Sequence, residues 1–289
     1  RSSLDFDGCK QMLKRPKEVE FNFPQPPAPY PPSQRSGALI GPSGVGKTTT
    51  AIAMLMGPYR GVYSRVWVFS PSCAKGVDPA WDAWRKHVKE VMKVPDEEQT
   101  MWHTWEPEVL EKLIARHAKI NTHMKDKKHK RGFSALALVD DFADAGEKVM
   151  HSSTNVLTSL FVRGRHLGVA CWLLTQKLRI VSLICRTNFC WMLVWRLRNA
   201  KERDQIFEEL SALLPLRTLQ AMYELATAEK HSFWYINLLN EREEMFFKNF
   251  EHRMVPSAGR MFPQSKGHEP LPTGEAALQL PVPRMGAGA

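Results

Sequence analysis

Residues 37–50 read GALIGPSGVGKTTT, and this stretch decides the fold. Residues 37–40 are typical of a short buried strand, and residues 41–48 match the G-x-x-x-x-G-K-[ST] pattern of a phosphate-binding loop. A helix-favouring stretch follows at 47–56. A strand that leads through a glycine loop into a helix presents backbone N–H groups and the positive end of the helix to an anion. The competing interpretation, a glycine turn that only caps a helix, does not require all four fixed positions.

The loop therefore predicts a nucleotide site with ATP and Mg²⁺ as cofactors. Lys47 would reach the β- and γ-phosphates, and the hydroxyl of Thr48 would ligate Mg²⁺. The predicted nucleotide-binding residues are Gly41, Pro42, Ser43, Gly44, Val45, Gly46, Lys47, Thr48 and Thr49.

A second half of the site is predicted where the apolar run 134–139 ends in Asp140 and Asp141. Asp140, at the carboxyl end of a buried strand, would hold Mg²⁺ opposite Thr48. Asp141 is the candidate for orienting or deprotonating the attacking water. The alternatives for Asp141 are a helix N-cap and an outer-shell contact to the metal.

Two further groups are candidates for catalysis. Gln176 ends the next predicted strand, where an amide can contact the γ-phosphate and the water, although a surface glutamine is the alternative. Arg163 and Arg165 are predicted to lie in a loop between a helix and a strand, with Gly164 freeing the backbone, and to act on a neighbouring subunit's nucleotide. The competitors for that role are Arg179, Arg186, Arg196 and Arg198, each of which could equally be a surface ion-pair partner.

The chain of 289 residues carries 40 Lys and Arg against 30 Asp and Glu, a net charge of +10. This balance favours a polyanionic partner, although it can also serve solubility alone. The basic run 125–131 is interpreted as a solvated loop or as a contact to DNA phosphates. The five cysteines form no C-x-x-C pair, which favours a reducing compartment without disulfides or a zinc site. We expect no transmembrane segment and no signal peptide, although the chain begins at Arg1 and a preceding portion could carry one.

Alternating elements predict one α/β domain at 35–255, with a parallel sheet covered by helices on both faces. A proline-rich lead-in at 1–34 is expected to be an extended spacer or to lie across the domain surface. Residues 256–289 are expected to be a disordered tail. A terminal β-hairpin is predicted from 231–238 and 243–247. The predicted strands are 37–40, 65–70, 134–139, 168–174 and 189–194, and the predicted helices are 47–56, 79–92, 106–120, 152–164, 200–212 and 215–228.

Together these segments resemble the FtsK–HerA superfamily, and within it the genome-packaging ATPases of large double-stranded DNA viruses and related transposons. The resemblance covers about 35–250. It is carried by GPSGVGKTTT at 41–50, VFSPS at 68–72, LALVDDF at 136–142, FVRGRHLGV at 161–169, LLTQK at 173–177 and CRTN at 185–188.

The resemblance implies a RecA-like P-loop NTPase with strand order 5-1-4-3-2 that forms a pentameric or hexameric ring and translocates double-stranded DNA into a capsid. It also implies capsid proteins as partners, and a location in the host cytoplasm or nucleus or in the virion, without secretion. The family often has Asp-Glu where this chain has Asp140-Asp141, whereas its viral branch tolerates Asp-Asp. As the shorter side chain, Asp141 must approach the water more closely than a glutamate to act as the base. Two alternatives stay open: a nucleotide-dependent assembly switch with little turnover, and a DNA-pumping motor of replication or repair.

Overall fold

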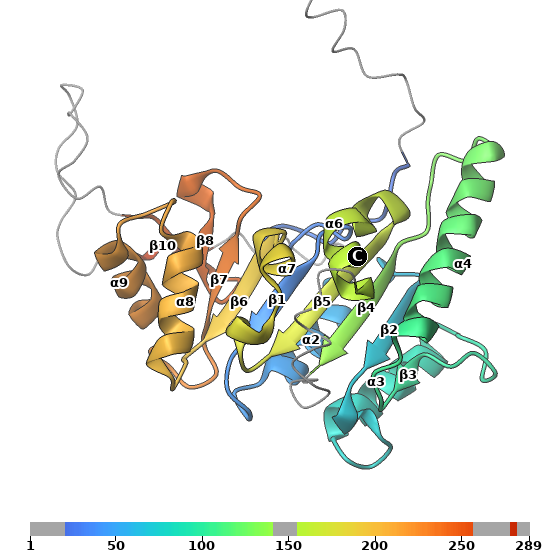
Figure 1. The fold of residues 1–289 in the computed structure, drawn as a ribbon, viewed down its shortest axis with the longest axis horizontal. Coiled ribbons are helices and arrows are strands. Elements are labelled where there is room, and N and C mark those ends of the chain that lie inside the picture. Colours follow the sequence, from blue (N-terminus) through green and yellow to red (C-terminus); the bar gives the residue numbers. More distant parts are fainter. Residues whose placement is uncertain (1–20, 141–154, 257–277, 282–289) are drawn as a thin grey trace, which may run out of the picture.

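The computed structural model describes residues 21–140, 155–256 and 278–281. They form one ten-stranded sheet in the order β10-β9-β8-β7-β6-β1-β5-β4-β2-β3 (Figure 1). Strands β6, β1, β5, β4, β2 and β3 are parallel, and β7 to β10 extend the sheet with antiparallel pairs. The strands are β1 Gly37–Ile40, β2 Arg65–Phe69, β3 Met101–Trp102, β4 Ala135–Asp140, β5 Val169–Thr175, β6 Trp191–Trp195, β7 Phe233–Asn237, β8 Phe246–Lys248, β9 His252–Met254 and β10 Leu278–Pro281.

The central strand order confirms the predicted topology. Numbered along the chain, the five predicted strands correspond to β1, β2, β4, β5 and β6, and their order in the sheet is 5-1-4-3-2. Strand β5 therefore lies between the strand that leads into the phosphate-binding loop and the strand that ends in Asp140. The short edge strand β3, which pairs with β2 over two residues, was not predicted, because two residues carry no readable alternation.

Helices cover both faces of the sheet, as predicted. Helices α2 and α3 lie behind it in the view of Figure 1, and α4, α6, α7, α8 and α9 lie in front. The helices are α2 Lys47–Met56, α3 Pro79–Glu90, α4 Pro107–Asp126, α6 Val156–Leu167, α7 Leu183–Thr187, α8 Ala200–Leu210 and α9 Leu216–Ala226, with 3-10 turns at Pro71–Cys73, Leu178–Ile180 and Arg242–Glu244.

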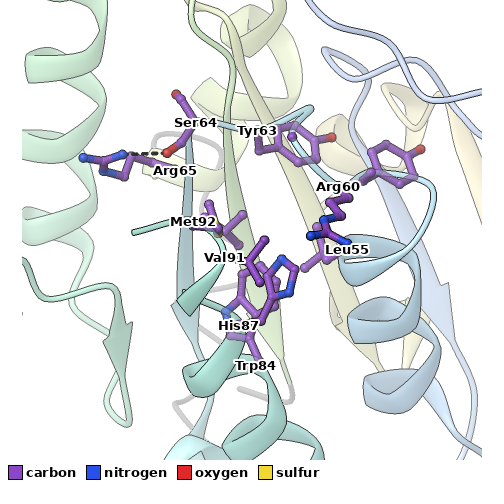
Figure 2. A pocket seen from close by; sticks show the side chains of 12 residues that line it. Leu55, Arg60, Tyr63, Ser64, Arg65, Trp84, His87, Val91 and Met92 are labelled. Atoms are coloured by element: carbon purple, nitrogen blue, oxygen red, sulfur yellow. Dashed lines mark hydrogen bonds between the residues drawn. The ribbon is translucent and has the colours of Figure 1, made fainter. Parts of the chain in front are cut away.

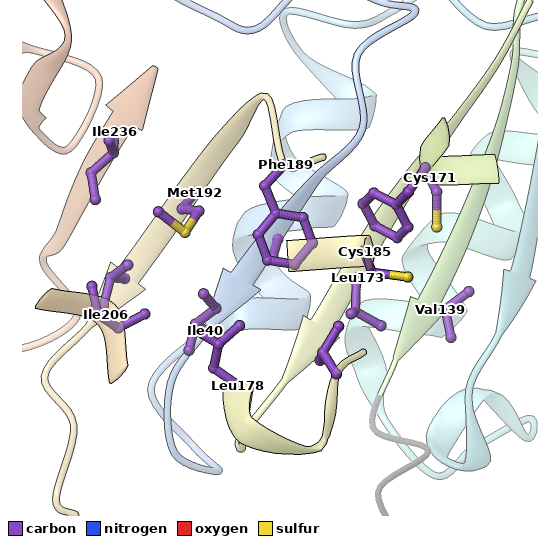
Figure 3. Close-up of a cluster of buried hydrophobic side chains, with 14 of the residues drawn as sticks. Ile40, Val139, Cys171, Leu173, Leu178, Cys185, Phe189, Met192, Ile206 and Ile236 are labelled. Carbon is purple, nitrogen blue, oxygen red and sulfur yellow. The ribbon is translucent and has the colours of Figure 1, made fainter. Parts of the chain in front are cut away.

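Two buried clusters, one on each face of the sheet, form the core. Strands β4 and β5 are buried at every position, as expected of parallel strands covered on both sides. Alternate side chains point to opposite faces, so Leu138 belongs to the cluster under α2 and α3, whereas Val139 belongs to the cluster under α6 and α7. Figure 3 shows the second cluster, in which Ile40, Leu173 and Leu178 pack around the ends of β1 and β5.

Helix α6 differs from the prediction in both its bounds and its role. The side chain of Asn155 caps its start by accepting a 2.8 Å hydrogen bond from the N–H of Thr158, so the helix begins at Val156. It ends at Leu167, because Gly168 adopts the left-handed conformation of a C-cap with φ of 72°. The expectation that Arg163 and Arg165 lie in a loop is wrong, since both are helical.

The antiparallel end of the sheet is more extensive than the predicted hairpin. Strands β7 and β8 pair as expected, but the second strand begins at Phe246 rather than 243, after the turn at Arg242–Glu244. Strand β9 pairs with β8, and β10 pairs with β9. Strand β10 falls inside the segment expected to be disordered, and the remaining residues beyond 256 lie outside the described part of the chain.

The proline-rich segment before β1 contacts the domain through tyrosine hydroxyls. Tyr63 donates to the carbonyl of Ser33 at 2.9 Å, and Tyr235 donates to the carbonyl of Pro29 at 2.8 Å. Tyr59 donates to the carbonyl of Pro31. The domain boundaries at 34/35 and 255/256 stay predictions. Within the described residues, no helix is both long enough and apolar enough to span a bilayer.

Candidate functional site: a phosphate-binding cavity at the carboxyl edge of the sheet

A cavity of about 790 Å³ opens at the carboxyl ends of β1, β2 and β4. Open α/β sheets bind their ligands at this edge. The phosphate-binding loop and the start of α2 form one wall, and the segment after β2 and the end of β4 form the other. The described lining residues are Ser43, Gly44, Val45, Gly46, Lys47, Thr48, Thr49, Thr50, Pro71, Ser72, Asp78, Asp140 and His231.

The glycines of the loop are required by its backbone. Gly44 and Gly46 have φ of 77° and 103°, in the left-handed region that side chains with a Cβ rarely adopt. Gly41 is required for a different reason, since a methyl group there would lie 2.9 Å from the Cβ of Trp195. No described side chain caps the N-terminus of α2. The first N–H groups of that helix therefore face the cavity as anion donors, as its sequence predicts.

Lys47 is held over the loop by the loop's own carbonyl groups. Its Nζ donates to the carbonyl of Gly41 at 2.8 Å and to that of Pro42 at 2.9 Å, and the residue is only 7% exposed. A buried ammonium group fixed at the floor of an anion-binding loop is placed to contact bound phosphates. Gly41 and Pro42 are thus structural partners of Lys47, whereas the other seven predicted nucleotide-binding residues line the cavity itself.

Thr48 and Asp140, the two predicted metal ligands, meet across the cavity. The Thr48 hydroxyl donates to Oδ2 of Asp140 at 3.4 Å, although the two residues are 92 positions apart. Both offer hard oxygen donors, and Asp140 is buried. Mg²⁺ is bound in nucleotide sites by one or two such oxygens together with phosphate oxygens and water. The donor set therefore fits Mg²⁺, which would neutralise phosphate charge between Thr48 and Asp140.

Two serines at this site were not assigned roles from the sequence. Ser70, directly after β2, donates to Oδ2 of Asp140 at 3.0 Å, and its Oγ lies 3.0 Å from that of Ser72. The signal was available in principle, since a serine that ends an apolar strand beside the Asp140 strand must lie at the same edge. Cys73 follows, and burial, then the Asp140 charge, raises the pKa of its thiol, while Arg85 partly opposes this. A neutral thiol there is not a nucleophile.

His231 is the other unpredicted member of the site. It lies just before β7, and its Nδ1 is 3.1 Å from the carbonyl oxygen of Val45 in the phosphate-binding loop. Because a carbonyl only accepts, Nδ1 carries the proton and donates. The residue has a positive φ of 65°. No sequence motif pointed to it, because the contact joins residues 186 positions apart.

Gln176 lies next to the loop but is not among the described residues that line the cavity. The N–H of Gly41 donates to the carbonyl of Thr175 at 3.1 Å, which places the half-buried Gln176 beside the start of the loop. Lys47 and Asp140 thus share the cavity, whereas the predicted meeting of Gln176 with them is not seen among the described residues that line it. Asp141 lies outside the described residues, and its predicted role stays a prediction.

The two arginines that the sequence favoured lie at the amino edge of the sheet, opposite the cavity. Arg163 and Arg165 are exposed on the last turns of α6, next to the amino end of β5. Gly164 between them does not free the backbone. It is buried in the helix, and a methyl group there would lie 2.4 Å from the carbonyl oxygen of Val169. Arg186 is engaged within its own chain, as it forms an ion pair with Glu209 and donates to the carbonyl of Val181 at 3.0 Å.

A second cavity, of about 540 Å³, lies at the amino end of β2 (Figure 2). His87 stacks on Trp84 at its floor, with ring centroids 5.3 Å apart, and Arg60 stands on its rim. Burial, and secondarily the charge of Arg60, lowers the pKa of His87. None of the described residues that line this cavity is acidic, so it offers no carboxylate to a Mg²⁺–nucleotide complex. The cavity at the carboxyl edge, which holds Asp140, is therefore the candidate nucleotide site.

One protein family and several solved structures are similar to this chain. None of the curated proteins matches the chain in sequence. Among solved structures, the chain is similar to the genome packaging NTPase B204 from Sulfolobus turreted icosahedral virus 2 in complex with ATP-gammaS, with 14% identity over 71% of this chain and 92% of that chain and a TM-score of 0.44. It is also similar to the pCW3 conjugation coupling protein TcpA, with 12% identity, 76% and 62% coverage and a TM-score of 0.46. EssC from Geobacillus thermodenitrificans is similar with 13% identity over 60% of this chain and 34% of that chain, and with a TM-score of 0.44.

The family described as poxvirus A32 protein matches residues 34–233, which is more than half of the chain. The match includes the phosphate-binding loop, the Asp140 strand, α6 and the Gln176 strand. The chain therefore belongs to the poxvirus A32 protein family, which confirms the predicted resemblance to genome-packaging ATPases of the FtsK–HerA superfamily.

Proposed function

We propose that the chain is an ATP-driven translocase of double-stranded DNA that packages a viral genome into a capsid. The observation that carries the proposal is the cavity in which Lys47, Thr48 and Asp140 converge, since these three side chains are what a Mg²⁺-dependent NTPase requires. The net charge of +10 supports a polyanionic partner. Membership of the A32 family supports genome packaging as the task.

In this proposal different residues bind the phosphates, hold the cation, activate the water and sense the γ-phosphate. The loop N–H groups and Lys47 bind and orient the phosphates, and Thr48 and Asp140 hold the cation that neutralises them. Asp141 accepts the proton of the attacking water, and Gln176, which directly follows β5, senses the γ-phosphate. Subunits form a ring, in which Arg163 or Arg165 of one subunit reaches the nucleotide of the next.

The experiment that tests the function measures ATP turnover with and without duplex DNA. We expect DNA to stimulate turnover, and we expect Lys47→Ala and Asp141→Asn each to abolish the stimulated rate. An arginine contributed by a neighbour is worth about 10³- to 10⁵-fold in comparable enzymes, so turnover should also depend on assembly. Negligible turnover that DNA does not change would overturn the motor and favour a nucleotide-dependent assembly switch.

A motor that serves replication or repair would hydrolyse ATP with the same DNA dependence. It is distinguished by its cargo, so the second arm asks whether the chain co-purifies with capsid proteins and is needed to fill capsids with DNA. Filled capsids in cells that express only Lys47→Ala protein would contradict the packaging role.

A further inference from the structure

The carboxylate of Asp140 is held by a buried hydroxyl that no motif assigns. Ser70 follows β2, which pairs in parallel with β4 so that Phe69 lies opposite Val139. The next residues of the two strands are therefore neighbours at the carboxyl edge. Ser70 has no exposed surface, and its Oγ donates to Oδ2 of Asp140 at 3.0 Å.

Behind Ser70 stands a second hydroxyl and then an indole. The Nε1–H of Trp81, in α3, donates to Oγ of Ser72 at 3.0 Å, and Oγ of Ser72 lies 3.0 Å from that of Ser70. An indole N–H only donates, and a hydroxyl has a single proton. Because Ser70 gives its proton to the carboxylate, Ser72 must give its own to Ser70. The four groups thus form a one-way chain from Trp81 through Ser72 and Ser70 to Asp140.

This series of hydrogen bonds links helix α3 to the end of β4, where Asp140 faces the candidate nucleotide site. Trp81 is fully buried and fixed in α3, whose capping residue Asp78 lines the same cavity. Thr48 donates to the same carboxylate oxygen from the opposite side, at 3.4 Å. A carboxylate that receives hydrogen bonds from two walls of a cavity has little freedom to rotate away from a shared ligand.

We propose that Ser70, supported by Ser72 and Trp81, is a positioning residue that orients the Asp140 carboxylate for the cation that accompanies the nucleotide. The inference rests on the proposed function, because it assigns Asp140 to Mg²⁺. Ser70 acts through Asp140 and touches neither substrate nor metal, so it is not a catalytic residue.

The test measures the affinity of the full chain for a fluorescent, non-hydrolysable ATP analogue in EDTA and in saturating Mg²⁺. We expect Ser70→Ala to leave the affinity in EDTA within about twofold of the wild type, while the gain on adding Mg²⁺ falls by about 10-fold, as is typical when an outer-shell partner of a metal ligand is removed. Trp81→Phe retains one aromatic ring but removes the pyrrole half of the indole with its N–H, and should reduce the gain about threefold, because the lost hydrogen bond joins neutral groups.

Ser134→Ala is the matched control. Ser134 is equally buried and immediately precedes β4, but its hydroxyl donates to the carbonyl of Val62 at the amino edge of the sheet. The Ser134→Ala variant should be less stable than the wild type but should show the same gain in nucleotide affinity on adding Mg²⁺.

The possible results distinguish a failure of the proposed function from a failure of the positioning role of Ser70. A wild-type chain that gains no affinity from Mg²⁺ would overturn the proposed function itself. A wild-type gain that persists in full in Ser70→Ala would overturn the positioning role and leave the proposed function standing. If Ser70→Ala does not fold, Trp81→Phe decides, and a gain equal to that of the wild type would overturn the inference.

Discussion

At the scale of single residues, His231 shows how a distant part of the chain shapes the phosphate-binding loop. Its imidazole donates to the carbonyl of Val45, in the middle of the loop, from the turn before β7. The carbonyl of His231 in turn accepts a 3.1 Å hydrogen bond from the indole of Trp195, the last residue of β6. The loop is thus tied to the neighbouring strand as well as to its own helix.

We therefore predict that His231→Ala weakens binding of a non-hydrolysable ATP analogue by about 2- to 10-fold, the value of one neutral hydrogen bond that orders the loop. His231→Asn should stay close to the wild type, because asparagine tolerates a positive φ and keeps an N–H donor. Isothermal titration calorimetry measures both. The control is His123→Ala, an exposed histidine of α4. Equal affinities for His231→Ala and the wild type would show that the contact does not order the loop.

At the scale of elements, α6 turns directly into β5, and this turn sets how closely helix and sheet can pack. Gly168 takes the left-handed conformation that ends the helix, and the backbone of Gly164 then passes close to the carbonyl of Val169. A glycine inside a helix normally costs stability relative to alanine. Here the missing Cβ is what permits the approach.

Whether Gly164→Ala raises or lowers the free energy of unfolding distinguishes helix propensity from this close approach. If only helix propensity mattered, Gly164→Ala would raise the free energy of unfolding by about 1 kcal/mol. We predict a loss of about 1–3 kcal/mol in the free energy of unfolding, because the new methyl group would meet the Val169 carbonyl oxygen at 2.4 Å. Urea denaturation gives the value, with exposed Val162→Ala on the same helix expected within about 0.5 kcal/mol of the wild type. A more stable Gly164→Ala chain would mean that helix and strand can separate freely.

At the scale of the whole molecule, the sheet separates the proposed nucleotide site from its proposed arginines. Strand β5 has seven residues and so spans about 20 Å between its amino end, next to Arg165, and its carboxyl end beside the phosphate-binding loop. An arginine at the amino edge cannot reach the nucleotide of its own chain. If Arg163 and Arg165 contribute to hydrolysis, they do so in another copy.

Mixing two inactive variants tests this arrangement. The double variant Arg163→Ala with Arg165→Ala and the single variant Lys47→Ala should each lack DNA-stimulated turnover. An equal mixture should recover roughly a quarter of the wild-type rate, because one neighbour then supplies the intact loop and the other the intact arginines. Arg217→Ala, an exposed arginine of α9, is the control and should stay active. A mixture as inactive as its components, or a chain that is monomeric in mass photometry with ATP and DNA, would contradict action between subunits.

The sequence alone determined the parts of this protein that depend on neighbouring residues. The loop at 41–48 and the apolar runs that became β1, β2, β4, β5 and β6 are contiguous patterns, and the carboxyl-edge rule was enough to bring Thr48 and Asp140 together. The Pro-rich stretch before β1 could be recognised as non-helical for the same local reason.

Only the tertiary structure decided which distant groups touch. Ser70 is 70 positions away from its partner Asp140, and His231 is 186 positions away from its partner Val45. No local sequence period encodes hydrogen bonds between residues so far apart. The helical placement of Arg163 and Arg165 was equally hidden, because Gly164 reads as a break in the sequence and is instead a close contact with the backbone of Val169. Local patterns specify elements, whereas the packing of side chains between elements specifies the site.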